Sequence, residues 1–362
     1  PLPSPLPVPS PSAAATATAD GNHLRVFLMT MGPGDAVWER FGHNAIWIHD
    51  ARRGTDVAYN WGMFDFEQEA FLRRFLMGRM LYSMAPGDAN WTVRAYVAPD
   101  RSVWVQELTL TPAQRLELQQ FLEWNERPEN RDYRYDYYRD NCSTRVRDAL
   151  DMVLGGQLWE QTGEQPAGTT YREHTRRLTA SDPLLYTGLN LAMGPEIDRP
   201  LSVWEEMFLP LAMREHVREL TVLDEDGRRV PLVLNEVELH ASSRPEEATE
   251  APFHLPWFLA MGLALGGAFI LLGRASQRSR AARIGFASLA ALWAAAIGVL
   301  GTIITALWAV TDHIVTYGNE NILQANPFAL ALAVLVPALV AGREWARRPA
   351  LRVARVVAGG RG

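Results

Sequence analysis

The sequence predicts an α+β domain followed by three apolar helices that cross a membrane. A bilayer core requires about 20 consecutive apolar residues per helix. Three stretches near the C-terminus carry no ionisable side chain: Pro256 to Gly273, Ile284 to Val310 and Pro327 to Ala341. The third is the shortest, and a re-entrant or interfacial helix is its alternative reading. Ahead of them, strand-like and helix-like segments follow one another without an internal repeat, which favours an α+β domain with mainly antiparallel strands.

The placement of arginine predicts which side of the membrane each part occupies. Short cytoplasmic loops are enriched in positive charge. The loop between the first two stretches holds four arginines and the segment after the third holds six, whereas the loop from Thr311 to Asn326 holds none. We therefore expect a multi-pass protein of the inner membrane whose N-terminal domain and second loop lie on the periplasmic side.

Five regions are predicted along the chain. The first is rich in proline and alanine, a composition that cannot bury enough apolar surface to fold, so it is expected to be a flexible spacer. The regions are the spacer 1–22, the folded periplasmic domain 23–240, an acidic linker 241–255, the membrane helices 256–342 and a basic cytoplasmic tail 343–362.

The charge balance excludes several classes of function. After Pro256 the chain has ten arginines and three acidic residues, a net charge of +7, which leaves −13 for the preceding part of a chain whose total is −6. An acidic domain is a poor match for phosphate backbones, so no nucleic-acid partner is expected. All 35 basic residues are arginine, which excludes a Schiff-base lysine and a phosphate-loop lysine.

Four strands are predicted early in the domain from apolar runs bounded by turn residues. A Gly-Pro-Gly turn at residues 32–34 ends the first strand, and residues 50–55 form a hairpin loop between the second and third. The strands cover His23–Met31, Gly42–His49, Asp56–Trp61 and Ser102–Leu110, and the aromatic segment Tyr133–Tyr138 is expected to be extended.

Helices are predicted from apolar spacing and from capping residues. Thr111 followed by Pro112 is a typical helix start. A second helix is expected to begin at Asn141 and Cys142, because apolar residues then recur on one face as far as Val153. The predicted helices cover Phe66–Met77, Thr111–Asn125, the segment from Asn141, Tyr171–Leu178 and Ser202–Leu220, and a late hairpin turns at Asp224–Gly227.

Cys142 is the candidate nucleophile. A thiol attacks only as its thiolate, and the first turn of a helix favours that form through the helix dipole and its free N–H groups. The polar neighbours Asn141, Ser143 and Thr144 suit an accessible helix start, and Asn141 is expected to contact the substrate. The alternative is that this single cysteine is a small buried hydrophobic residue.

His43 is the candidate general base, and Asn60 is its candidate partner. His43 lies in the otherwise apolar segment 41–47, where a histidine costs desolvation unless it is used. A structural histidine bonded to backbone is the alternative, and His49 on the same strand face is the rival base. His174 and His216 lie on helix faces rich in charge and are expected to be solvated. Asn60, on the next strand, is placed to orient the imidazole.

Seven short motifs together form a specific pattern. They are Gly42-His43-Asn44-Ala45-Ile46-Trp47-Ile48, Tyr59-Asn60-Trp61-Gly62, Phe64-Asp65-Phe66, Tyr135-Asp136-Tyr137, Asn141-Cys142-Ser143-Thr144, Glu205-Glu206-Met207-Phe208-Leu209-Pro210, and Thr311-Asp312-His313 with Asn319 and Asn321. This pattern resembles the Lnb-type periplasmic domain family, which includes bacterial lipoprotein N-acyltransferases. The most specific feature of the likeness is the order, histidine first and cysteine second.

The resemblance implies a fold and an activity. It implies a circularly permuted papain-like domain, with an order similar to that of the lecithin:retinol acyltransferase group. It supports His43 as base and Cys142 as nucleophile, and Asn60 less directly because the hairpin before Asn60 is longer than in that group. The implied reaction moves an acyl chain from a membrane phospholipid to the N-terminal amine of a lipoprotein through an acyl-cysteine, with no metal or other cofactor. Its rate is expected to rise with pH through the range where histidine titrates.

The loop between the second and third apolar stretches is expected to complete the site. It holds Asp312, His313, Asn319 and Asn321, more polar groups than a turn needs, at the depth of lipid head groups and on the predicted side of the N-terminal domain. We expect these four residues to bind substrate near Cys142. A solvated loop is the plain alternative.

Two other functions fit the same residues. A papain-like cysteine peptidase or amidase acting in the cell envelope would use the same cysteine and histidine, although it needs no multi-span anchor. A non-enzymatic envelope scaffold would keep Cys142 as a core residue. The reactivity of Cys142 toward a thiol reagent separates the scaffold from the two enzymes.

Overall fold

The computed structural model describes residues 21–357, and all but the last two residues of the predicted spacer lie outside this range. The chain divides into two compact units. The first comprises residues up to Thr179 together with Arg199–Thr249, and the second comprises Ala180–Asp198 together with the chain from Glu250. Residues 180–198, which the sequence placed in the N-terminal domain, therefore pack with the C-terminal helices.

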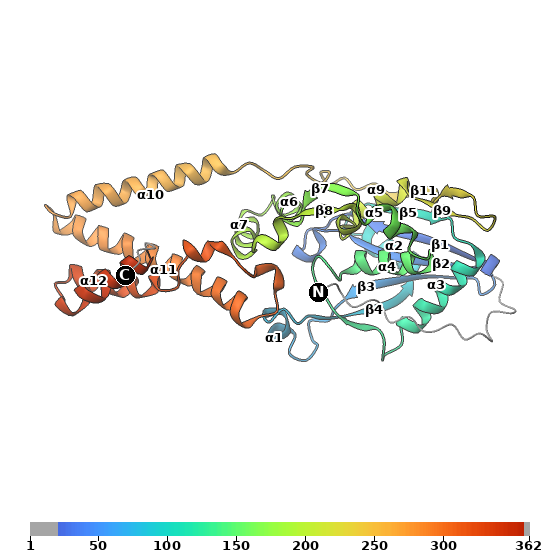
Figure 1. Cartoon of the computed structure of the whole chain (residues 1–362), viewed down its shortest axis with the longest axis horizontal. Helices are drawn as coiled ribbons and strands as arrows, with labels where there is room; N and C mark the ends of the chain where they lie inside the picture. Colours follow the sequence, from blue (N-terminus) through green and yellow to red (C-terminus); the bar gives the residue numbers. More distant parts are fainter. Residues whose placement is uncertain (1–20, 358–362) are drawn as a thin grey trace. The chain divides into compact units, whose positions relative to one another are not determined.

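The first unit is built on a seven-stranded antiparallel sheet (Figure 1). Four of its strands are those that the sequence predicts, β6 overlaps the start of the predicted extended segment, and β4 and β11 were missed. Strand β4 contains Pro86 and Gly87, which interrupt a strand pattern, and β11 is an edge strand with mostly exposed side chains. In spatial order the strands are β11 (Val233–His240), β5 (Val103–Leu108), β1 (Leu24–Met31), β2 (His43–Asp50), β3 (Thr55–Met63), β4 (Leu81–Asp88) and β6 (Asp132–Arg134).

Helices cover both faces of this sheet. On one face, α3 (Pro112–Asn125) and α4 (Cys142–Val153) pack on the main core, where Val146, Ala149 and Leu150 are fully buried. On the other face, α2 (Ala89–Val97) packs on a smaller core formed by alternate residues of the same strands. Helix α3 begins as predicted, because the Thr111 hydroxyl and the Gln114 side chain cap each other's backbone N–H groups.

Three predicted elements differ from the structure. The predicted helix Phe66–Met77 is only α1 (Phe71–Leu76), after a series of turns. The predicted helix Ser202–Leu220 is two helices, α8 (Val203–Glu206) and α9 (Pro210–Glu219), because proline cannot continue a helix but suits its first position. The aromatic segment Tyr133–Tyr138 leaves the sheet after Arg134.

The remaining elements of the first unit are short. They are α5 (Gln157–Thr162), β7 (Pro166–Thr170), α6 (Tyr171–Leu178), β8 (Pro200–Ser202), β9 (Thr221–Leu223) and β10 (Arg229–Pro231), with 3-10 turns η1 (Gly21–His23) and η2 (Val37–Glu39). Strands β9 and β10 form the predicted late hairpin.

The second unit contains two helices that are long and apolar enough to cross a membrane, among the residues described. They are α10 (Leu255–Ala275) and α11 (Arg280–Val310), and they coincide with the first two predicted spans. Helix α12 (Ala329–Val340) corresponds to the third, but with 12 residues it is shorter than a bilayer requires. The predicted tail forms α13 (Arg347–Val357) after the turn η6 (Glu344–Ala346).

Glycine allows the chain around α12 to pack closely on α11. A Cβ at Gly298 would lie 2.5 Å from the backbone nitrogen of Leu330, and one at Gly301 would lie 2.0 Å from the carbonyl oxygen of Ala325. Both distances are shorter than any real Cβ contact, so only glycine fits at these two positions. The short approach is typical of helix packing through small residues.

Candidate active site

Cys142 is the first residue of α4, and Asn141 caps the helix. The Oδ1 atom of Asn141 accepts hydrogen bonds from the backbone N–H groups of Ser143 and Thr144, at 2.9 and 3.0 Å. Its Nδ2 atom donates to the carbonyl oxygens of Tyr137 and Phe208, each at 3.0 Å. Both acceptor and both donor positions of the amide are thus used. Asn141 fixes the helix start, and its predicted contact with substrate stays a prediction.

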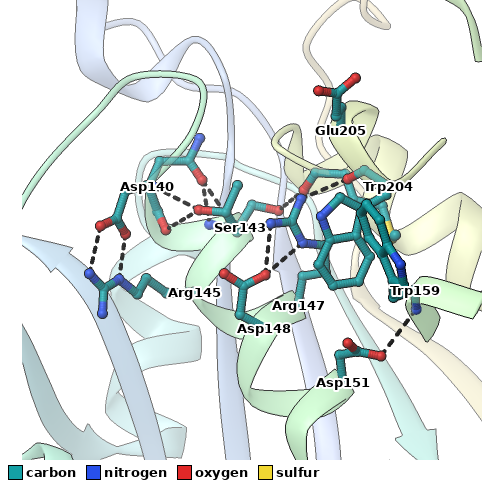
Figure 2. Close-up of polar contacts among 12 residues, drawn as sticks. Asp140, Ser143, Arg145, Arg147, Asp148, Asp151, Trp159, Trp204 and Glu205 are labelled. Atoms are coloured by element: carbon teal, nitrogen blue, oxygen red, sulfur yellow. Dashed lines mark hydrogen bonds and ion pairs between the residues drawn. The ribbon is translucent and has the colours of Figure 1, made fainter. Parts of the chain in front are cut away.

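Helix α4 is held in place along its length by polar contacts (Figure 2). Asp140 forms a paired ion contact with Arg145, and the Arg147 guanidinium donates to Asp148 and to the carbonyl oxygen of Trp204. The backbone N–H of Trp159 donates to Asp151 at the C-terminal end of the helix. A helix so fixed gives its first residue a defined position.

Ser143 attaches the start of α4 to strand β2. Its hydroxyl lies 2.8 Å from Asn44 Oδ1 and 2.7 Å from the carbonyl oxygen of Met207. The Nδ2 atom of Asn44 donates to Thr30 Oγ1 at 2.9 Å on the neighbouring strand β1. The residue next to His43 in the chain is therefore bonded directly to the residue next to Cys142.

His43 and Asn60 form the predicted pair. The Nε2 atom of His43 lies 3.1 Å from Asn60 Oδ1, across the antiparallel pairing of β2 with β3. The Nδ2 atom of Asn60 donates to the carbonyl oxygen of Ala58, which leaves Oδ1 to accept from the imidazole. Nε2 therefore carries the hydrogen, and Nδ1 keeps the lone pair that a base requires.

Gly62 brings the strand of Asn60 against Cys142. It has a φ of +84° at an irregularity in the β3–β4 pairing, and a Cβ there would lie 3.3 Å from Cys142 Cβ. The sulfur of Cys142 also accepts hydrogen bonds from the backbone N–H groups of Asn44 and Ser143. The structure thus gathers the predicted cysteine, histidine and asparagine around the adjoining ends of β2, β3 and α4.

The surroundings keep both reactive groups neutral. Burial raises the pKa of the Cys142 thiol above its ordinary value, although the N–H groups at its sulfur and the charge of Arg101 act in the opposite direction. Burial also lowers the pKa of His43 to about 4, against the effect of its bond to Asn60, and Arg101 lowers it further. These two pKa shifts favour a neutral thiol and a neutral imidazole at neutral pH over a thiolate and an imidazolium.

Two residues that sequence reasoning missed support the histidine. The ring of Tyr96, on α2, stacks on His43 with centroids 5.9 Å apart. The Arg101 guanidinium lies 4.5 Å from the Tyr96 ring centroid and donates to the carbonyl oxygen of Gly32 at 2.8 Å. Arg101 is only 4% exposed, yet it follows an ordinary loop in the sequence, so no local pattern marks it as a site residue.

The prediction that His174 and His216 are solvated is wrong. Both Nε2 atoms lie 2.8 Å from the Glu206 carboxylate, and His174 is buried. Burial disfavours the ionised carboxylate, but the bonds from the two histidines and from Thr169 outweigh it and hold the pKa of Glu206 well below its usual range. The helix faces looked solvated in the sequence because each group has its hydrogen-bond partner on a different helix, among α6, α8 and α9. His49, the rival base, pairs with Asp56 at 2.9 Å.

The four loop residues predicted to bind substrate belong to the second unit. Asp312 and His313 lie at the start of the 3-10 turn η4 (Ile314–Thr316), and Asn319 caps η5 (Glu320–Leu323). The Nδ2 atoms of Asn319 and Asn321 both donate to the carbonyl oxygen of Leu191, at 2.7 and 3.1 Å.

These bonds attach the loop to α7 (Pro183–Ala192), which precedes the 3-10 turn η3 (Pro195–Asp198). Gly194 continues the contact, since its N–H donates to Val315 O at 2.8 Å. The two asparagines thus have a structural role within the second unit. The predicted proximity of the loop to Cys142 stays a prediction.

A separate pocket of about 590 Å³ opens in the first unit. Its lining combines arginines with aromatic rings and includes Arg147, Trp159 and Trp204, which Figure 2 shows beside α4. The Arg147 guanidinium lies 3.9 Å from the Trp204 ring centroid. Arg147 is therefore part of both the pocket wall and helix α4, which begins with Cys142.

These features define an α+β domain that presents a half-buried cysteine at a helix start beside a histidine–asparagine pair on two strands. Residues 11–177 match the family model described as the Lnb N-terminal periplasmic domain, and this segment of the chain belongs to that family. No curated protein and no solved structure matched the chain. The family and the two long apolar helices together indicate a membrane protein with a periplasmic N-terminal domain.

Proposed function

We propose that the protein is a membrane-bound thiol acyltransferase that moves an acyl chain from a phospholipid to the N-terminal amine of a lipoprotein. The observation that carries this proposal is the arrangement of Cys142 at the start of α4, against Gly62 two residues after Asn60, with the Asn60 amide fixing the His43 tautomer. Such a cysteine–histidine–amide set is the recurring geometry of acyl transfer to sulfur.

In the proposed first half-reaction, the Nδ1 atom of His43 takes the proton from the Cys142 thiol as sulfur bonds to the ester carbonyl carbon. The tetrahedral adduct then collapses, the carbon–oxygen bond breaks, and the lipid alkoxide leaves with the proton from His43. An acyl-cysteine thioester remains. Because both groups start neutral, this transfer creates charge only as the carbonyl is attacked.

In the second half-reaction the amine of the acceptor attacks the thioester. The nitrogen–carbon bond forms, His43 receives the amine proton, and the carbon–sulfur bond breaks to return the thiolate, which takes that proton back. The products are an amide and the starting enzyme. The charge of Arg101 favours the thiolate leaving group, since it lowers the pKa of Cys142.

The wider architecture proposed is a circularly permuted papain-like domain on a three-helix membrane segment. The order of the functional residues supports the permutation, because His43 precedes Cys142 in the chain and lies on β2. The arginine asymmetry of the sequence supports an inner-membrane location with loop 311–326 in the periplasm. Helix α12 would then span with the apolar residues that flank it.

Mass spectrometry of lipoprotein N-termini tests the function directly. Cells that carry the protein are compared with cells that lack it and with cells that carry Cys142→Ala. We expect the N-terminal amide-linked acyl chain only with the intact protein. Lipoproteins with the same N-termini in all three strains, or cleaved envelope peptides in place of acylated amines, would overturn the proposal in favour of a scaffold or an amidase.

The pH dependence of the site is a second expectation, and it differs from the one drawn from sequence. His43 is a base above its pKa of about 4 and is lost as a base only when pH falls through that value. The acidic limb of the transfer rate is therefore expected near pH 4, below the usual histidine range. The rate of Cys142 alkylation by iodoacetamide is proportional to the thiolate fraction. Because the pKa of the thiol is raised, this rate should still increase as pH rises past 9.

Both profiles are measured on the full chain in nanodiscs. An alkylation rate that is already maximal at neutral pH would show a preformed thiolate–imidazolium pair and contradict the neutral site.

A further inference from the structure

An aromatic and apolar patch covers one end of the first unit. We call it the aromatic patch: Trp38, Met63, Phe64, Phe66, Phe71, Leu72, Phe75 and Leu76. Trp38, Phe66 and Leu72 are 59%, 58% and 65% exposed. Their neighbours form a continuous series of ring contacts, such as Phe64 with Phe66 at 5.0 Å and Phe66 with Phe71 at 5.1 Å.

Helix α1 has no buried residue, although its sequence is Phe-Leu-Arg-Arg-Phe-Leu. A soluble surface rarely keeps so many large apolar side chains together, because each loses the free energy of burial. Bulky aromatic and aliphatic side chains mixed with arginine are instead the composition of elements that lie at a membrane interface.

The charge around the patch favours a bilayer surface as its occupant. The segment 65–79 contains Asp65, Glu67 and Glu69 together with three arginines, so it is neutral. The part of the chain before Pro256 has a net charge of −13. The neutral patch therefore does not repel a zwitterionic or anionic lipid surface, unlike the acidic remainder of this part of the chain. The same chain also continues into helices that are able to cross a membrane.

The aromatic patch is also continuous with the cysteine site. The ring of Phe64 stacks on Tyr82 at 5.0 Å, and Tyr82 stacks on Tyr135 at 4.3 Å. A carbon of the Tyr135 ring lies 4.0 Å from the position of a Gly62 Cβ, which in turn lies 3.3 Å from Cys142 Cβ. A series of aromatic rings thus leads from the exposed patch to Gly62, the glycine that lies against Cys142.

We propose that the aromatic patch docks on the surface of the phospholipid bilayer, with Trp38, Phe66 and Leu72 among the head groups and upper acyl chains. Docking in this way presents the Cys142 site to the ester region of the lipids. The contact itself does not depend on the proposed function, whereas the delivery of an ester to Cys142 does.

A fluorescent probe on the patch tests the contact. In the full chain with Cys142→Ser, the only cysteine is removed, and Leu72→Cys then carries a bimane in lipid nanodiscs. Leu234→Cys is the matched control, because Leu234 is 67% exposed on β11, at the other edge of the sheet. We expect blue-shifted emission and several-fold stronger quenching by nitroxide-labelled lipid at Leu72 than at Leu234.

Two outcomes overturn the docking. A probe at Leu72 as exposed to water as the one at Leu234 means that nothing covers the patch. A blue-shifted probe that nitroxide lipid does not quench means that protein covers it, either a partner, a second copy or the helices of this chain. Transfer is assayed separately in the intact protein, which keeps Cys142. Quenching of the Leu72 probe together with no acyl transfer by the intact protein would keep the docking and refute the proposed function.

A second observation, a buried phenol without a partner, leads to an independent inference. Tyr133 is 8% exposed, and its O–H group has no acceptor among the described residues, although the backbone N–H of Gly62 approaches the oxygen. The oxygen lies 4.0 Å from the position of a Gly62 Cβ, beside the same glycine that contacts Cys142. Burial of a hydroxyl whose hydrogen has no acceptor destabilises the fold, so a phenylalanine would be the more stable choice here.

We infer that Tyr133 donates a hydrogen bond to the carbonyl oxygen of the substrate as negative charge develops on it, a role that rests on the proposed function. An unsatisfied donor held beside the nucleophile needs no reorganisation when the oxyanion forms. In the protein without substrate, the Tyr133 O–H group has no acceptor among the described residues.

Tyr133→Phe in the full chain tests this role. We expect transfer to fall by roughly 10-fold to 10³-fold in kcat, the loss typical of one oxyanion donor, with unchanged or higher thermal stability and unchanged alkylation of Cys142. Tyr138→Phe is the control, because the Tyr138 hydroxyl is bonded to Thr175 at 2.7 Å. A variant of Tyr133 that transfers at the normal rate, or that is less stable, refutes the assignment. If the intact protein transfers nothing, the proposed function fails first.

Discussion

Replacement of Cys142 with alanine is expected to abolish acyl transfer, with a loss on the order of 10³-fold or more, because no other group can form the acyl intermediate. The fold should survive. The side chain loses one sulfur atom at a half-buried helix start, and Asn141, Ser143 and Thr144 keep every bond that caps α4. Transfer is measured with a fluorescent phospholipid and a synthetic lipopeptide, and folding by thermal unfolding of the full chain.

Cys142→Ser sharpens this result. The serine hydroxyl fits the same space but is a much weaker nucleophile beside a neutral histidine, so transfer should remain near the level of the alanine variant. Normal transfer in either variant would refute the thiol mechanism. Loss of transfer accompanied by a large fall in unfolding temperature would instead assign Cys142 to the core, as the scaffold reading requires.

The core of the site could be predicted from sequence because its signals are local. The cap at Asn141, the apolar face of α4 and the unusual histidine in an apolar strand each depend on residues within a few positions of one another. The antiparallel hairpin of β2 and β3 then brings Asn60 opposite the strand of His43. A short loop and a period-2 pattern are enough to predict such a neighbour.

The parts that could not be predicted depend on distant contacts. Arg101 and Tyr96 reach His43 only because α2 folds over the second face of the sheet, and α2 follows a strand interrupted by proline. Glu206 takes its two histidines from α6 and α9, so each helix face alone looked solvated. A single sequence carries no signal for pairs of this kind.

The pKa values also required the structure. Sequence reasoning assigns a helix-start cysteine a low pKa through the dipole and the free N–H groups. The N–H groups are present at the sulfur, yet burial against the strand of Gly62 outweighs them. In the proposed mechanism, a site whose thiol and imidazole are both neutral therefore depends on His43 as a base when sulfur attacks, and not on a thiolate formed beforehand.

Replacement of His43 with glutamine is the clearest test of that dependence. A glutamine is similar in length and can still bond to Asn60, but it cannot accept the thiol proton. We expect transfer to fall by about 10²-fold to 10⁴-fold, the usual contribution of a general base. His49→Gln is the control, because His49 lies on the same strand and is bonded to Asp56 instead. Its transfer rate should stay close to that of the intact protein.

The pH profile distinguishes the base from a structural histidine. In the His43→Gln variant the residual transfer should lose its limb near pH 4 and rise with hydroxide, since only the thiolate fraction of Cys142 then reacts. If the His43→Gln variant transfers acyl chains at the normal rate and the His49→Gln variant does not, His49 and not His43 is the base. An equal loss of transfer in both variants, together with lowered unfolding temperatures, would show that both histidines stabilise strand β2 and that His43 is not the base.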